Sequence, residues 1–165
     1  MKYIISFKNI IYFIEMGDIS FYFEKYGEEI YRYLRRLTRD EETAKDLLQE
    51  TFLRAMRSSI DDEKAKNYLF RIAHNLAMDY FNESKRFVDI PLDGEESSEN
   101  AYEIMENKDI WKPLELIEKS ILILYYQEGY SYKEISEKLD IPLNTVKSHI
   151  FRAKKKIYNY LKSEK

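Results

Sequence analysis

Residues that interrupt helices are scarce in this 165-residue sequence, which contains four glycines and three prolines. Both residue types destabilise the interior of a helix, so their scarcity permits long uninterrupted helices. Apolar residues recur at three- and four-residue spacing along most of the chain, and no alternating pattern typical of a strand persists. The sequence therefore predicts an all-α fold, with about seven helices in two groups.

Several kinds of chemistry lack their usual residues. There is no cysteine, which excludes disulfides, thiolate zinc sites and a cysteine nucleophile. His74 and His149 are far apart in the sequence, and neither has a partner at metal-ligand spacing. Neither a P-loop nor a Gly-x-Gly-x-x-Gly motif occurs. We expect no metal, no cofactor, no small-molecule substrate and no enzymatic activity, and we expect His74 to lie in the core or to line a groove.

Charge is distributed unevenly, although the net charge is only -3. Residues 87–111 contain eight acidic residues and one base, and residues 147–165 contain seven bases and one acid. The acidic stretch also contains Pro91, Gly94 and a Glu-Glu-Ser-Ser-Glu-Asn run, a composition that cannot bury enough apolar surface to order itself. We interpret the middle as a flexible acidic linker and the basic end as a DNA-facing segment. Two ordinary solvated faces are the alternative.

The expected organisation is two small helical domains joined by that linker. Residues 17–87 form the first domain, residues 88–110 the linker and residues 111–165 the second domain. Residues 1–16 are apolar and aromatic, too short and too often interrupted to span a membrane, and without a signal-peptide cleavage site. We interpret them as an upstream extension, with Met16 as the start of translation. A short amphipathic helix packed on the first domain is the alternative.

Helical periodicity divides the first domain into buried and polar faces. One helix places Ala44, Leu48, Thr51, Phe52 and Ala55 on its inner face. Its opposite face holds Asp46, Gln49, Glu50 and Leu53. An exposed leucine among polar residues favours a partner surface over a merely solvated one.

The second domain contains the features of a helix-turn-helix between Tyr132 and Ala153. Gly129 ends one helix, and Ser131 and Glu134 form a capping box for the next. A turn at residues 140–142 leads to a last helix with basic residues. The N-terminal part of such a second helix meets base edges in the major groove. Lys147, Ser148 and Phe151 project outward there, and Arg152, Lys154 and Lys155 are better placed for phosphates. An αα-hairpin with a solvated lysine face is the alternative.

Residues 129–154 resemble region four of the extracytoplasmic-function (ECF) subfamily of sigma-70 RNA polymerase sigma factors. The segments Ala44-Lys-Asp-Leu-Leu-Gln-Glu-Thr-Phe and Tyr68-Leu-Phe-Arg-Ile-Ala-His-Asn-Leu-Ala-Met-Asp-Tyr resemble region two of that family. Both blocks in this order are far more specific than a helix-turn-helix alone. The resemblance implies a cytoplasmic sigma factor that binds core RNA polymerase and directs promoter-specific initiation. It also implies an anti-sigma partner.

The resemblance further implies residue roles in region two. Asp46, Gln49, Glu50 and Leu53 match the surface that binds the clamp coiled coil of the polymerase β′ subunit. Asn75 matches the position that lies against a flipped base of the promoter -10 element. Arg71, Lys85 and Arg86 are expected to bind phosphates of that element, and Tyr80 is expected to stack on its bases. We expect Phe81 to be a core residue.

In region four, the resemblance implies a contact with the β flap and recognition of the -35 element by Lys147, Ser148, His149, Phe151, Arg152 and Lys155. Three positions depart from the family pattern. Tyr68 replaces a common tryptophan, Asn144 a frequent glycine and His149 a frequent arginine. The last change removes one expected phosphate contact.

Two other classes of protein remain as alternatives. A stand-alone helix-turn-helix regulator explains the residues after Trp111 equally well, but leaves the polar face around Gln49 and the Asn75 segment unexplained. A protein-interaction module without DNA binding predicts no steep salt dependence of DNA affinity.

Overall fold

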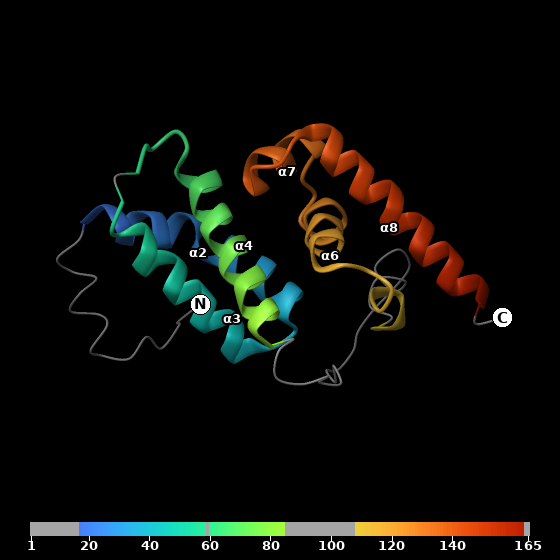
Figure 1. Cartoon of the computed structure of the whole chain (residues 1–165). Helices are drawn as coiled ribbons and strands as arrows, with labels where there is room; N and C mark the ends of the chain where they lie inside the picture. Colours follow the sequence, from blue (N-terminus) through green and yellow to red (C-terminus); the bar gives the residue numbers. More distant parts are fainter. Residues whose placement is uncertain (1–16, 59, 85–107, 164–165) are drawn as a thin grey trace.

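The computed structural model describes residues 17–58, 60–84 and 108–163, and within these ranges every regular element is a helix (Figure 1). The first group consists of α2 (Gly17–Thr38), α3 (Glu41–Ala55) and α4 (Ala65–Ser84). The second group consists of the 3₁₀ helix η1 (Lys108–Trp111), α6 (Leu116–Leu122), the π-helix η2 (Ile123–Gln127), α7 (Tyr132–Leu139) and α8 (Leu143–Ser163). The predicted all-α fold with two helical groups is confirmed.

Two expected segments are described little or not at all. The expected extension over residues 1–16 lies outside the described residues, as does the expected linker up to residue 107. The last residues assigned to the linker belong to η1, where Ile110 is buried.

The first group has the inner face that its periodicity predicts. Ala44, Leu48, Thr51, Phe52 and Ala55 of α3 are all buried. They pack against Ile30, Leu34 and Leu37 of α2, which are buried as well. Asp40 caps α3, because its Oδ2 accepts a hydrogen bond of 2.7 Å from the Thr43 backbone N–H. Hydrogen bonds from the side chain and the backbone of Thr43 lower the pKa of Asp40.

Local signals also define the helix-turn-helix. Gly129 has a φ of 77°, a left-handed conformation that glycine adopts without steric cost. Ser131 and Glu134 form the predicted capping box of α7: the Ser131 N–H donates to Glu134 Oε2 at 2.8 Å, and the Glu134 N–H donates to Ser131 Oγ. Asp140 ends α7 in the left-handed region with a φ of 55°. Ile135, Leu139, Val146, Ile150 and Ala153 form the buried side of this unit.

The two groups pack directly on each other, which the sequence did not predict. Helix α4 contacts α2 and α3 on one side and α7 on the other (Figure 1). Its buried residues cover more of its circumference than a single apolar stripe would: Ala65, Leu69, Phe70, Ala73, His74, Leu76 and Ala77. The aromatic ring of Phe70 lies between Tyr33 of α2 and Tyr130 before α7, at centroid distances of 5.8 and 6.1 Å.

Polar groups cross this junction as well. The hydroxyl of Tyr33 lies 2.9 Å from Nδ1 of His74 on α4, and it also hydrogen bonds with Ser120 of α6. All three residues are buried, so His74 lies in the core, which is one of the two positions predicted for it. Burial raises the pKa of Tyr33 well above its usual range and lowers the pKa of His74 to about 4.

This burial predicts that acid destabilises the fold through His74. The folded protein favours the neutral imidazole, so His74 contributes stability above the unfolded pKa of about 6.5 that is lost as the pH falls toward 4. The full difference corresponds to about 3 kcal/mol. Urea unfolding at pH 7.0 and pH 4.5 measures it.

His74→Gln serves as the comparison, since glutamine does not titrate. It is expected to lower the free energy of unfolding at pH 7 and to reduce the further loss at pH 4.5. An equal acid-induced loss in both proteins would assign the effect to other groups.

Candidate DNA and protein interfaces

The outer face of α8 is rich in basic and aromatic side chains. Lys147, Ser148, Arg152, Lys154 and Lys155 are exposed, and Phe151 is 70% exposed. Val146, Ile150 and Ala153 hold the opposite face of the helix in the core. An aromatic ring left in water beside lysines, next to a capped helix-turn-helix, has the chemistry of a nucleic-acid reading surface.

Local hydrogen bonds orient two of the predicted residues on this face. The Ser148 hydroxyl donates to the Asn144 carbonyl at 2.8 Å, which leaves its oxygen as an acceptor. His149 is half-buried, and its Nδ1 lies 3.0 Å from Nη2 of Arg152. Burial, followed by the Arg152 charge, lowers the pKa of His149. A neutral imidazole against Arg152 positions that guanidinium and adds little positive charge of its own.

A surface hollow of about 410 Å³ lies beside the start of α8. Tyr125, Ser131, Tyr132, Lys133, Leu143 and Lys147 line it. Sequence reasoning identified only Lys147 among these as a DNA-facing residue. The others come from η2, from the start of α7 and from the first residue of α8, which only the fold brings together, so no local signal marked them.

One lysine of the basic segment forms ion pairs within the protein. The Lys156 ammonium contacts Glu118 Oε2 of α6 at 2.8 Å and Oε1 of Glu115, the N-cap residue of α6, at 3.1 Å. The Glu118 side chain is 1% exposed, so Lys156 supplies the charge that this buried carboxylate requires. The charge count of the segment therefore overstates the number of bases that can face DNA.

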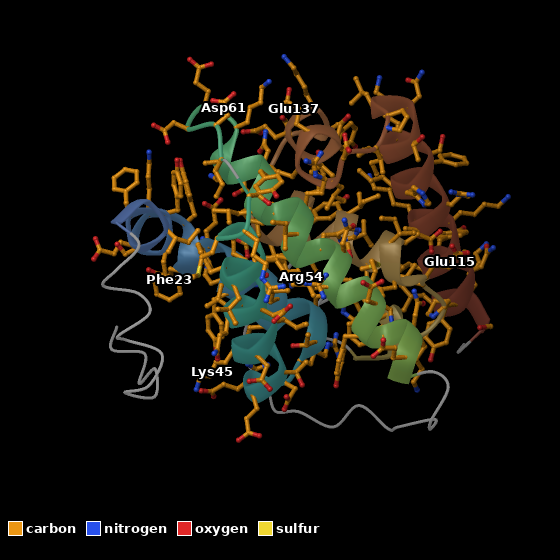
Figure 2. The ribbon with its side chains drawn as sticks, turned by 60° about the vertical axis from the view of Figure 1, so that its left-hand side comes forward. Phe23, Lys45, Arg54, Asp61, Glu115 and Glu137 are labelled. Carbon is orange, nitrogen blue, oxygen red and sulfur yellow. The ribbon has the colours of Figure 1, made fainter. Side chains whose placement is uncertain are left out.

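The outer face of α3 forms a second surface. Asp46, Gln49 and Leu53 are exposed, Leu53 to 38%, and Glu50 is partly exposed. Arg54 Nε donates to Glu50 Oε1 at 2.8 Å, which fixes the direction of that carboxylate. Figure 2 shows α3 and α8 on opposite sides of the molecule, with Lys45 and Arg54 labelled on α3. The structure thus groups the four predicted polymerase-binding residues on one accessible face.

The predicted -10 residues lie along α4. Asn75 is exposed, and Arg71 one turn before it is about two-fifths exposed. Arg71 is not free, however: its Nη1 contacts Asp140 Oδ2 at 3.0 Å, and its guanidinium lies over the Tyr68 ring. Tyr80 is 40% exposed, whereas Phe81 is partly buried and packs against the core. Lys85 and Arg86 lie outside the described residues.

Within residues 17–58, 60–84 and 108–163, no group of three or more His, Asp or Glu side chains is arranged to hold a metal ion. In those same ranges no helix has the length and apolarity that a membrane span requires.

Family models match both helical groups. Sigma-70 region 2 matches residues 22–87, which span α2 to α4, and Sigma-70, region 4 matches residues 114–157, which span α6 to most of α8. The two matched segments contain the α3, α4 and α8 surfaces described above. The fold and these surfaces therefore define a sigma-70 type transcription initiation factor.

Whole-chain relatives narrow the class. The ECF RNA polymerase sigma factor SigM of Bacillus subtilis is 32% identical over 146 residues, covering 82% of this chain and 90% of SigM. SigW of the same organism is 30% identical, covering 83% of this chain and 85% of SigW. The sigma factor RpoE of Bartonella quintana, solved in complex with the anti-sigma factor NepR, shares the fold with a TM-score of 0.63 at 20% identity, covering 90% of this chain and 99% of RpoE.

The chain belongs to the ECF subfamily of sigma-70 RNA polymerase sigma factors, which bind core polymerase and direct promoter-specific initiation of transcription.

The exposure of Lys147 predicts a role in reading sequence. Lys147→Ala is expected to weaken recognition of the -35 element by about 1–3 kcal/mol, because an ammonium that donates to base acceptors is lost. Competition binding of reconstituted holoenzyme to promoter fragments with single -35 substitutions measures this.

Lys155→Ala is the matched control. Loss of this lysine's phosphate contact should weaken binding to all fragments alike and lower the salt slope by about 1. If Lys147→Ala leaves the sequence preference unchanged, Lys147 does not read bases.

Proposed function

We propose that this factor holds the polymerase through α3 and reads the promoter through α4 and α8. The observation that carries the proposal is the coexistence, on one chain of the ECF family, of an exposed α3 face and an exposed basic α8 face. A stand-alone regulator needs only the second of these surfaces. Separate faces allow the factor to hold polymerase and DNA simultaneously.

The polymerase-binding face consists of Asp46, Gln49, Glu50 and Leu53. Its partner is the clamp coiled coil of the β′ subunit. Acidic and amide groups around an exposed leucine suit an interface with a polar rim and an apolar contact. The ion pair between Glu50 and Arg54 supports this assignment, because it holds one of the rim carboxylates in a defined direction.

Promoter recognition is divided between the two helical groups. Asn75 offers an amide that pairs with the edge of a flipped -10 base, and extrusion of that base costs a few kcal/mol of stacking. Exposed Tyr80 supplies a ring on which a base can stack. The -35 element is read by Lys147, Ser148 and Phe151 and held by phosphate contacts from Arg152 and Lys155, with His149 orienting Arg152.

Two further partners complete the proposal. The second group also contacts the β flap of the polymerase, and the factor works in the cytoplasm, where polymerase and promoter are found. An anti-sigma factor controls it, as NepR binds the RpoE of Bartonella quintana. We propose no catalytic activity for this chain.

Run-off transcription with purified core polymerase tests the function. The full chain should support initiation at a subset of promoters, and pull-down should recover the core enzyme. Leu53→Asp is expected to abolish recovery of the core enzyme, whereas Lys25→Asp, at an exposed position on α2, should retain it. Failure of the unmodified chain to bind the core enzyme would reject the proposal.

Asn75→Ala separates promoter melting from polymerase binding. It is expected to reduce open-complex formation, measured by permanganate reactivity of unpaired thymines, while binding to core polymerase stays unchanged. Asn82→Ala, at an exposed asparagine two turns further along α4, is the control. An equal loss of polymerase binding and of melting would remove the base-pocket role from Asn75.

A further inference from the structure

The contact between the two helical groups contains a buried lysine. Lys138 of α7 is only 2% exposed, and its ammonium lies 4.4 Å from the ring centroid of Phe70 and 4.3 Å from that of Tyr130. It also contacts Asn67 Oδ1 of α4 at 3.4 Å. Desolvation lowers the pKa of Lys138 to about 8. A lysine is rarely buried without a specific partner. The contacts of Lys138 with Phe70 and Asn67 therefore join the two groups through cation–π and hydrogen-bond interactions.

A carboxylate joins the groups at a second point. The Glu128 side chain, just after η2, is 3% exposed and contacts two guanidinium groups of α2. Arg36 Nη1 lies 2.5 Å from its Oε1, and Arg32 Nη2 lies 3.3 Å from its Oε2. A buried carboxylate of one group is thus paired with two arginines of the other group, and separating the groups would return this carboxylate to water without its partners.

The third contact involves the predicted -10 surface. Arg71 pairs with Asp140 at 3.0 Å, and Asp140 lies in the turn between α7 and α8. A guanidinium that holds this carboxylate cannot hold a DNA phosphate in the same direction. Because Arg71 and Asn75 are one turn apart on α4, the turn of the helix-turn-helix lies beside the surface assigned to the -10 element.

The exposed α3 face is outside this contact. Helices α3 and α8 lie on opposite sides of the molecule, and α7 packs on α4 (Figure 2). The observed arrangement therefore leaves the proposed polymerase-binding face accessible while it engages a residue of the proposed promoter-binding face.

We propose that the contact of α4 and α2 with α7 and η2 is an autoinhibited state, in which Lys138 and Glu128 hold the groups together and Asp140 occupies Arg71. The proposal rests on the promoter-binding role assigned above to α4. Promoter DNA binds the open state and competes with Asp140 for Arg71. A ligand shifts such an equilibrium only through its different affinity for the two states, and DNA has that difference because closure engages Arg71.

The absence of cysteine in the sequence allows a direct test. Glu42→Cys on α3 and Asn159→Cys on α8, both exposed positions outside the residues assigned to promoter binding, accept a pair of fluorescent dyes. Energy transfer in the full chain should be high. Glu128→Arg should lower it by repulsion from Arg32 and Arg36, and adding Arg36→Glu should restore it. Glu24→Arg, the same charge change at an exposed site on α2, should leave it unchanged.

Opening should raise DNA affinity as well. The affinity for a mixed-sequence 30-base-pair duplex is measured at low salt. If a tenth to a third of the unmodified chain is open, the Glu128→Arg variant should bind this duplex between about threefold and tenfold more tightly than the Glu24→Arg variant. Asp140→Asn is a milder variant that keeps a residue tolerant of positive φ, and it should also raise affinity by releasing Arg71.

The outcomes separate the two proposals. If Glu128→Arg leaves energy transfer unchanged in a chain whose circular dichroism shows it folded, closure does not depend on this contact and the proposal fails. It also fails if the groups separate but neither Glu128→Arg nor Asp140→Asn raises DNA affinity. Should Glu128→Arg unfold the chain, Asp140→Asn alone decides. Pull-down of core polymerase by the unmodified chain reports on the proposed function independently.

Discussion

Packing of α4 against both helical groups is the interaction on which the rest of the structure depends. Phe70 places an aromatic ring between Tyr33 and Tyr130, and His74 continues the contact through a hydrogen bond to Tyr33. Burying apolar surface on two sides of one helix joins two domains that are each too small to bury a large core. The same helix carries Arg71 and Asn75, the residues proposed to contact promoter DNA, on its remaining face.

Charged groups at this junction make the contact specific. Apolar surfaces pack in many registers, but Lys138 between two rings and Glu128 between two arginines each require one relative position of the groups. Such groups are costly to bury and are strongly stabilised only when every partner is present. An interface of this kind is suited to opening and closing as a unit, in contrast to the continuous apolar contact of α2 with α3.

Local physics accounts for most of the candidate sites. The capping box at Ser131, the left-handed Gly129 and the spacing of Val146, Ile150 and Ala153 were readable along the chain, because each depends on neighbours within about one helical turn. Exposure of Leu53 and Phe151 followed from the same periodicity. The roles of Lys156 and His149 were not readable in this way. Lys156 pairs with Glu118 of α6 and with its N-cap residue Glu115, some forty positions earlier, and the charge of His149 depends on its burial.

The sequence by itself determined the helical class, the division into two groups, the helix-turn-helix and the faces of α3 and α8, since these follow from propensity, capping and periodicity. Only the tertiary structure decided how the groups meet. Nothing local shows that Lys138 is buried on Phe70, that Glu128 reaches Arg36, or that Asp140 holds Arg71. Those contacts join residues about seventy or more positions apart, and their energies arise from desolvation and shape, which exist only once the chain is folded.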